Sequence, residues 1–304
     1  MEIRACLRES SCPMRALILS DVHANLEALT AALEAADHWD ALWNLGDMVG
    51  YGASPNEVLE LLRPLSTLTV RGNHDRVCCG LGSALHFNPT ARAAAEWTER
   101  ELSAANLEWL RGLPQGPLQV DIPSARGLRA MATGAGHDAA RDAGDDAGHE
   151  AGHDAGHDAG RCEDGAEVTL AHGSPLDEDD YILNMRDAWL PLQQMKTALT
   201  FVGHTHIQGG FWQKEQEWHE IRPRLPGRKE RWTLAVPAGT RYLINPGSVG
   251  QPRDYDWRAG FAIYDSEECD VTYHRVAYDV RSAQARIKRA GLPDRLAARL
   301  REGR

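Results

Sequence analysis

Five short apolar runs recur along the chain, and each one ends in Gly or in a polar residue. They are RALILS (15–20), ALWNLG (41–46), STLTVRG (66–72), EVTLAHG (167–173) and ALTFVGH (198–204). Runs of this length, rich in Leu, Val and Ile, are typical of buried strands. The pattern therefore predicts a strand at each of these places.

Between the first three runs, the apolar positions take a helical spacing. Residues 25–36 place Leu26, Leu29 and Leu33 at i, i+3 and i+7, and residues 54–62 begin with a Ser-Pro pair that suits the start of a helix. Strands that alternate with helices favour a parallel sheet, because the chain must cross over between neighbouring strands. We therefore predict a β-α-β-α-β unit at the start of the chain.

Further along, a helical pair is predicted over residues 89–101 and 104–111, with Ser103 as the cap between them. After residue 115 the segments become short and β-rich, which predicts a second, mostly antiparallel sheet. Its expected strands are 127–133, 231–236, 241–245, 261–264 and 271–276. The basic tail, residues 280–300, is interpreted as a solvated surface helix with one buried face.

Residues 142–161 repeat a tetrapeptide with Gly at every fourth position and almost no bulky apolar side chain. Such a segment cannot bury enough surface to offset its ordering entropy. We predict a disordered insertion at about 134–163, which is an inert spacer rather than a loose metal-binding His tract. Residues 1–13 have no periodicity and are predicted to be a disordered extension, which leaves 14–304 as a single domain.

The composition is that of a globular protein, with 304 residues of which 42% are hydrophobic and 25% charged. The net charge is −11, and residues 137–160 contribute seven acidic residues against one Arg. Binding to nucleic acid or to an anionic membrane rests on clustered Lys and Arg, so neither is expected as a partner. The basic run at 222–231 is interpreted as a solvated turn, because it contains Pro and Gly and lacks interleaved aromatic residues.

The six cysteines show no repeated spacing and no CxxC motif, which predicts reduced thiols. The apolar run at 16–19 is too short for the core of a signal peptide. Together these features predict a cytoplasmic protein.

Residues that bind metals follow the five apolar runs. They are Asp21 and His23, Asp47, the Gly-Asn-His-Asp segment 72–75, His172, and the Gly-His-Thr-His segment 203–206. Each piece alone has an ordinary structural explanation. In open α/β sheets, however, ligands bind beyond the carboxyl ends of the strands, so the joint occurrence predicts that all these residues converge.

The segments DVH, GDMVGYG, GNHD, AHGSP and GHTH together resemble the calcineurin-like metallophosphoesterases, from about residue 14 to 273. Within that superfamily the chain looks most similar to the small bacterial and archaeal phosphodiesterases of the YfcE-like group. The resemblance implies an α/β fold, a four-layer α/β/β/α sandwich of two mixed sheets flanked by helices.

The resemblance also implies a dinuclear metal centre. The ligands would be Asp21, His23 and His206 for the first ion, Asn73, His172 and His204 for the second, and Asp47 for both. A set of carboxylate, imidazole and amide oxygen donors without thiolate suits Mn²⁺, with Fe, Zn²⁺, Ni²⁺ or Co²⁺ as alternatives. Such a pair of divalent ions would hold the hydroxide that attacks phosphorus.

His74 is left without a metal, and the resemblance makes it the general acid that protonates the leaving oxygen. Asp75 is predicted to orient the His74 imidazole and to favour its charged form. The alternatives are that His74 only binds the phosphate and that Asp75 only stabilises its loop.

Contacts to the substrate are predicted for Arg253, Tyr51 and His86, with Phe87 as a further candidate. Arg253 ends the segment NPGSVGQPR (245–253), which also resembles the same phosphodiesterase group, and its planar fork suits a phosphate oxygen. A salt bridge is the alternative role for Arg253, and packing is the alternative for the others.

We therefore expect a metal-dependent phosphoesterase, and in particular a phosphodiesterase acting on a small phosphoester or nucleotide. The alternatives are a hydrolase of dinucleotide polyphosphates or phosphomonoesters, and a non-catalytic scaffold of the same fold. A protein phosphatase is disfavoured, because Gly50-Tyr51 replaces the Asp-Arg pair that grips phosphate in the serine/threonine phosphatases of this superfamily.

Overall fold

The computed structural model describes residues 3–6, 14–122, 167–227 and 230–304. The predicted insertion at 134–163 and the predicted strand at 127–133 lie outside the described residues. Residues 3–6 form a strand, so the prediction that residues 1–13 are a disordered extension is wrong for this part.

One sheet of the described chain has six strands in the order β10-β13-β12-β2-β3-β4. Its parallel half consists of β2 (Arg15–Leu19), β3 (Ala41–Asn44) and β4 (Leu68–Thr69). Its antiparallel half consists of β12 (Ala259–Asp265), β13 (Asp270–Val276) and β10 (Arg231–Ala235). The two halves join where β12 pairs with β2, with Ala262 opposite Ile18.

The other sheet has seven described strands in the order β1-β5-β6-β7-β11-β8-β9. They are β1 (Ile3–Cys6), β5 (Leu118–Asp121), β6 (Glu167–Leu170), β7 (Leu199–Phe201), β11 (Arg241–Asn245), β8 (Gly209–Lys214) and β9 (Glu217–Ile221). Because β6, β7 and β11 run parallel, this sheet is mixed rather than mostly antiparallel. The strands predicted at 231–236, 261–264 and 271–276 extend the first sheet instead, which corrects their assignment to the second.

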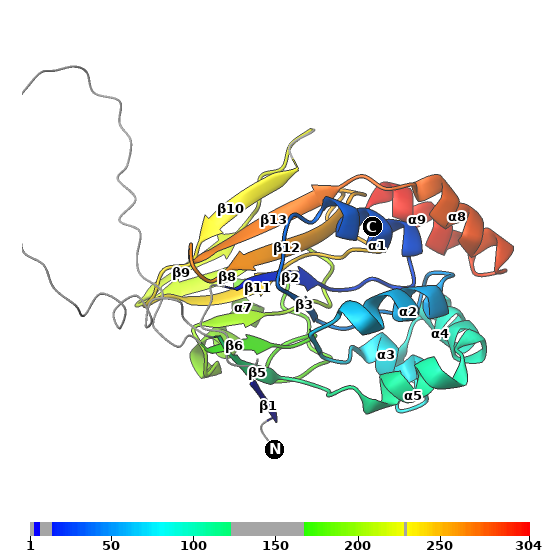
Figure 1. Cartoon of the computed structure of the whole chain (residues 1–304), viewed down its shortest axis with the longest axis horizontal. Coiled ribbons are helices and arrows are strands. Elements are labelled where there is room, and N and C mark those ends of the chain that lie inside the picture. Colours follow the sequence, from blue (N-terminus) through cyan, green and yellow to red (C-terminus); the bar gives the residue numbers. More distant parts are fainter. Residues whose placement is uncertain (1–2, 7–13, 123–166, 228–229) are drawn as a thin grey trace, which may run out of the picture.

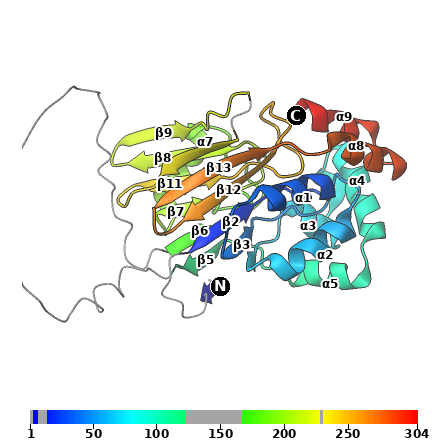
Figure 2. The same cartoon turned by 45° about the horizontal axis from the view of Figure 1, so that its top comes forward.

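Most helices lie together in Figures 1 and 2, on the side of the six-stranded sheet. They are α1 (Leu26–Ala35), α2 (Pro55–Leu65), α3 (Asn73–Cys78), α4 (Pro89–Glu101), α5 (Ala104–Gly112), α8 (Val280–Arg289) and α9 (Asp294–Glu302). A short 3₁₀ turn, η1 (Ala84–His86), precedes α4. Helix α7 (Met185–Gln194) instead contacts β8, β9 and β11 of the seven-stranded sheet.

Three hydrophobic cores lie between these layers. In β2 the side chains alternate, so that Leu17 and Leu19 pack against the helices while Ala16 and Ile18 face the other sheet. The core between the sheets is aromatic, with the Trp43 and Phe201 ring centroids 6.0 Å apart. A third core joins α7 to the outer face of the seven-stranded sheet. The molecule is thus a four-layer α/β/β/α sandwich of two mixed sheets, as expected.

The tail differs from its prediction as one helix over 280–300. It forms two helices, α8 and α9, because Gly291 adopts a left-handed φ of 70° and Pro293 stands at the start of α9. Leu296 and Leu300 of α9 are buried in the helical layer. The tail therefore packs as part of the fold.

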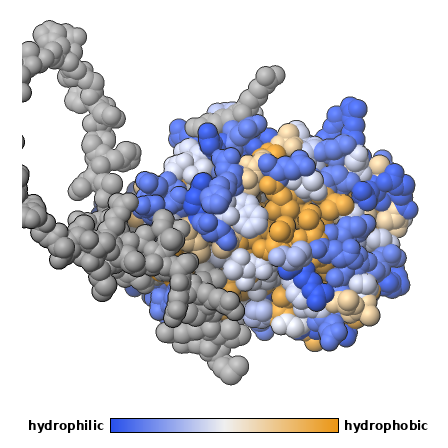
Figure 3. Space-filling view, viewed as in Figure 1, coloured by the Kyte–Doolittle hydropathy of each residue, from blue (hydrophilic) through white to orange (hydrophobic). Residues whose placement is uncertain are grey.

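The surface seen in Figure 3 is mostly hydrophilic, with hydrophobic residues gathered near its middle. No helix in the described part of the chain is both long and apolar enough to span a membrane. Cys78 and Cys79 are free and buried, but Cys269 is disulfide-bonded, which contradicts the prediction that all six cysteines are reduced.

Candidate metal centre

The loops that follow the parallel strands of both sheets meet at one edge of the sandwich. Asp21 follows β2, Asp47 follows β3, His172 follows β6, and His204 follows β7. Asp21, Asp47 and His204 have left-handed φ angles of 53°, 54° and 64°. Residues other than Gly rarely adopt such angles. Strained backbone of this kind clusters at functional sites.

The first cluster of donors consists of Asp21, His23, Asp47 and His206, all of them buried. His23 Nδ1 lies 3.0 Å from the Val49 carbonyl oxygen, and His206 Nδ1 lies 2.6 Å from that of Gln251. Each Nδ1 must carry a proton to donate to its carbonyl, which leaves both Nε2 atoms with a free lone pair. These two Nε2 atoms nevertheless face each other at 3.2 Å.

The second cluster consists of Asp47, His172 and His204, with Asn73 beside it. His172 Nδ1 is committed to the Leu45 carbonyl oxygen at 2.9 Å. Its Nε2 lies 3.1 Å from Asn73 Oδ1 and 3.1 Å from His204 Nδ1. Burial alone would lower the pKa of His172, but the Asp47 and Asp21 carboxylates raise it to about 10, so this cluster draws in positive charge.

Asp47 lies between the two clusters. Its Oδ1 accepts a hydrogen bond from the His74 backbone N–H at 2.8 Å. Its Oδ2 is buried without a hydrogen-bond partner, 3.7 Å from His23 Nε2 and 3.3 Å from His172 Nε2. Asp21 Oδ1 is likewise buried and unpartnered, 3.3 Å from His206 Nε2.

These contacts bring all seven predicted metal ligands together. Among their atoms, Asp21 Oδ1, Asp47 Oδ2 and His204 Nε2 are buried without a hydrogen-bond partner, and buried polar atoms of this kind are costly unless a cation satisfies them. The residues present therefore fit two divalent ions with Asp47 at the junction.

His74 is buried beside the clusters but belongs to neither. Its ring centroid lies 4.9 Å from that of His23, 4.4 Å from that of Tyr51 and 4.5 Å from that of Phe87. His74 Nδ1 has no hydrogen-bond partner. Burial lowers the pKa of His74 to about 4, against the opposing effect of Asp47.

Both carboxylate oxygens of Asp75 accept hydrogen bonds from backbone N–H groups rather than from the His74 ring, so the structure gives no support to its predicted role in orienting the imidazole. Its Oδ1 accepts from the Val49 N–H at 3.1 Å and its Oδ2 from the Gly72 N–H at 3.1 Å. Asp75 therefore holds two loops of the site together, which is the structural alternative considered for it.

Of the predicted substrate contacts, Arg253 and Tyr51 lie at the site. The Arg253 guanidinium carbon is 5.8 Å from the centre of the Tyr51 ring, and Tyr51 in turn lies against His23 and His74. His86 is exposed and has no described contact with the clusters, whereas its neighbour Phe87 packs on His74. The prediction for His86 is therefore not supported.

Two further residues reach the site without having been singled out in the sequence. The Tyr181 ring stacks on that of His204 with centroids 3.9 Å apart. Arg299 of α9 places its guanidinium carbon 5.8 Å from the centre of the Tyr51 ring. No pattern in the sequence distinguished either residue, because both reach the site through tertiary packing.

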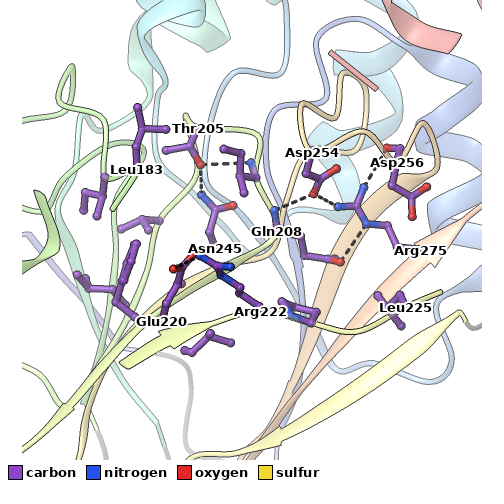
Figure 4. A pocket seen from close by; sticks show the side chains of 18 residues that line it. Leu183, Thr205, Gln208, Glu220, Arg222, Leu225, Asn245, Asp254, Asp256 and Arg275 are labelled. Atoms are coloured by element: carbon purple, nitrogen blue, oxygen red, sulfur yellow. Dashed lines mark hydrogen bonds and ion pairs between the residues drawn. The ribbon is translucent and has the colours of Figure 1, made fainter. Parts of the chain in front are cut away.

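A cavity of about 360 Å³ adjoins the loop that carries His204 and His206 (Figure 4). Asn245 donates to Thr205 Oγ1 at 3.0 Å, which braces this loop from the cavity side. Arg275 donates through Nε to Gln208 Oε1 at 3.0 Å and forms an ion pair with Asp254. The polar lining thus supports the loop of His204 and His206 through hydrogen bonds and an ion pair.

The four-layer fold and the two adjoining donor clusters define a class, the metal-dependent hydrolases that bind their ions at the carboxyl edges of two facing sheets. A family model for the calcineurin-like phosphoesterase superfamily domain matches residues 14–268, and the chain belongs to this superfamily. The members of this family are metal-dependent. Membership of this chain in the family indicates that it is a hydrolase of phosphoesters.

Several known proteins are similar to this chain. An uncharacterized protein of Methanocaldococcus jannaschii, MJ0912, is 31% identical over 302 residues, which cover 94% of this chain and 97% of that one. The crystal structure of a metallophosphoesterase from Sphaerobacter thermophilus superposes with a TM-score of 0.70 at 38% identity, covering 96% of this chain and 100% of that chain. A symmetrical bis(5'-nucleosyl)-tetraphosphatase of Shewanella baltica is 32% identical over 102 residues, 33% of this chain and 36% of that protein.

Proposed function

We propose that this protein is a metal-dependent phosphodiesterase that hydrolyses its substrate by direct attack of water. The observation that carries the proposal is the pair of adjoining clusters of buried His and Asp side chains that share Asp47, with Asp47 Oδ2 and Asp21 Oδ1 left without hydrogen-bond partners. The buried His74, which lies next to the clusters without joining them, supports the assignment of hydrolysis rather than of simple metal binding.

In this proposal Asp21, His23 and His206 would hold the first ion and Asn73, His172 and His204 the second, with Asp47 common to both. Two divalent ions bound there, with Mn²⁺ as the proposed metal, would supply Lewis-acid chemistry to the phosphoryl oxygens and to the attacking water. The carbonyl oxygens of Val49, Gln251 and Leu45 fix the ring orientation of three of the imidazole ligands.

His74 is the group that protonates the leaving oxygen. In the free protein burial keeps it neutral, because its pKa is lowered to about 4. A phosphoryl anion next to the ring favours the charged imidazolium, as a nearby opposite charge does. Protonation of His74 is therefore coupled to the arrival of substrate.

A second candidate is a hydrolase of dinucleoside polyphosphates that uses the same centre. The partial similarity to the symmetrical bis(5'-nucleosyl)-tetraphosphatase of Shewanella baltica favours it. So does the presence of two arginines, Arg253 and Arg299, at the same tyrosine ring.

The test compares initial hydrolysis rates of a chromogenic phosphodiester and of its monoester counterpart, with metal-stripped protein before and after addition of Mn²⁺. We expect Mn²⁺ to restore a rate that favours the diester. His74→Ala should keep the bound metal and lower turnover by about 10² or more, the usual contribution of a proton-transfer group. A preference for the monoester contradicts the diesterase assignment, and unchanged turnover of the variant removes His74 from the mechanism.

A further inference from the structure

Two arginines from distant parts of the chain meet at the Tyr51 ring. Arg253 comes from the loop between β11 and β12, and Arg299 comes from α9 near the end of the chain. Each guanidinium carbon lies 5.8 Å from the centroid of the Tyr51 ring. The distance between the two guanidinium carbons is therefore at most twice this value. The same ring lies 4.7 Å from His23 and 4.4 Å from His74 between centroids, which places both arginines beside the metal centre.

Neither arginine forms an ion pair with an acidic side chain in the described part of the chain. Arg253 donates to Gln251 Oε1 at 3.1 Å, and its Nε is buried without a partner. Arg299 Nε donates to the backbone oxygen of Arg304. By contrast, the similarly half-buried Arg286 is paired with Glu27.

Two guanidinium groups held near one ring repel each other in the free protein. Burial, together with the nearby Arg253, lowers the pKa of Arg299 to about 10. Leu296 and Leu300 fix α9 in the helical layer, so Arg299 is held at this position by packing rather than by attraction. A pair of like charges held near each other in this way is stabilised when an anion binds within reach of both.

We propose that Arg253 and Arg299 together bind a second phosphoryl group of the substrate, so that the preferred substrate is an organic polyphosphate. The guanidinium fork matches the geometry of phosphate oxygens, and two forks suit a group with more than one negative charge. The further phosphoryl group lies next to the one at the metal centre, because Tyr51 separates the arginines from His23 and His74 by a single ring. The inference rests on the proposed phosphoesterase function and names its substrate class.

The kinetic test compares Arg299→Ala with Arg301→Ala, a control at an exposed position of the same helix. The substrates are a chromogenic diester with one phosphoryl group and a dinucleoside tetraphosphate. Loss of one charge-assisted contact should raise KM for the tetraphosphate by about tenfold or more in Arg299→Ala. The rate with the simple diester and both rates of Arg301→Ala should stay within about twofold of the wild type. Equal effects of Arg299→Ala on both substrates, or no effect on either, overturn the proposal.

A binding measurement separates this proposal from the catalytic one. Calorimetry with Mn²⁺-loaded protein compares inorganic triphosphate with inorganic monophosphate as ligands. The wild type and Arg301→Ala should bind triphosphate more tightly, and Arg299→Ala should lose that preference while keeping its affinity for monophosphate. Absence of the preference in the wild type refutes the arginine site, whereas absence of hydrolysis alone refutes the enzymatic function. If Arg299→Ala shows an altered melting temperature, Arg299→Gln takes its place in both measurements.

Discussion

Gly50 provides a sharp test of the position assigned to His74, because the two residues are in close contact. A Cβ atom at Gly50 would lie 2.6 Å from His74 Nδ1, whereas ordinary contact begins at 3.4 Å. The imidazole side chain is the part that can move, so Gly50→Ala should displace it by roughly 0.8 Å. A misplacement of about 1 Å of a reacting group can cost about 10² in rate, so we expect turnover to fall by about 10- to 100-fold with both metals retained.

Gly50 also has a left-handed φ of 84°, so the substitution strains the backbone as well. Gly239→Ala is the matched control, because Gly239 has a φ of 80° and open space where a Cβ would be. Each variant should lose about 1 kcal/mol of stability from the left-handed conformation. Only Gly50→Ala should lose turnover, measured with the chromogenic diester under saturating Mn²⁺ together with metal content and melting temperature.

A double variant decides whether the loss acts through the imidazole. In the His74→Ala background the ring is absent, so Gly50→Ala should cause no further decrease in turnover. If Gly50→Ala lowers turnover by the same factor with and without the His74 ring, the displacement argument is wrong. Equal losses in Gly50→Ala and Gly239→Ala would equally contradict it, because the backbone strain alone would then account for the effect.

Three other predictions follow from the site and its support. Asp47→Asn should lower the content of both metals, measured by mass spectrometry after gel filtration, and a full load of two ions would refute its bridging role. Removal of metal by a chelator should lower the melting temperature and Mn²⁺ should restore it, because ions that bind only the folded state stabilise it; an unchanged melting temperature would contradict the ion site. Arg275→Met leaves Asp254 without its ion-pair partner and should destabilise the protein by about 3–5 kcal/mol in urea unfolding, whereas a loss under about 1 kcal/mol would show that this network does not brace the fold.

The first part of the fold was predictable because its signals are local. The strands β2, β3 and β4 and the helices between them follow from apolar runs and helical spacing, and the crossover rule fixes their parallel order. The sheet to which β10, β12 and β13 belong was not predictable. The apolar pattern of a short strand indicates which of its faces is buried, but it does not indicate which other strand it pairs with. The pairing of β12 with β2 joins residues from opposite ends of the chain.

The predicted metal ligands converge for a reason the sequence contains, since each follows a strand that ends at the same edge of the sandwich. The structure does not support the roles predicted for Asp75 and His86, because proximity in sequence to His74 or Phe87 does not fix where a side chain points. Asp75 turns toward backbone N–H groups, and His86 lies exposed in η1. Arg299 depends on the packing of α9 onto the helical layer, a tertiary contact that a basic helical pattern does not specify.

Backbone hydrogen bonds between the loops explain how the strained conformation of the ligands is maintained. The Asp21 N–H donates to the Gly46 carbonyl oxygen at 3.0 Å, and the His23 N–H donates to that of Asp47 at 2.9 Å. These bonds continue the pairing of β2 with β3 beyond the ends of both strands. The fold itself therefore sets the positions of Asp21 and His23, as a preorganised metal site requires.

The loop that follows β11 links the candidate metal ligands to Arg253. The carbonyl oxygen of Gln251 orients His206, and the Gln251 side chain accepts from Arg253 two residues later. The Arg253 N–H in turn donates to the His206 carbonyl oxygen at 3.1 Å. One short segment thus fixes the His206 imidazole and the Arg253 guanidinium relative to each other. A shift of this loop should therefore alter metal binding and anion binding together. Substitutions at Gln251 should therefore change both properties, whereas substitutions at Arg299, which reaches Tyr51 from a separate helix, should change anion binding alone.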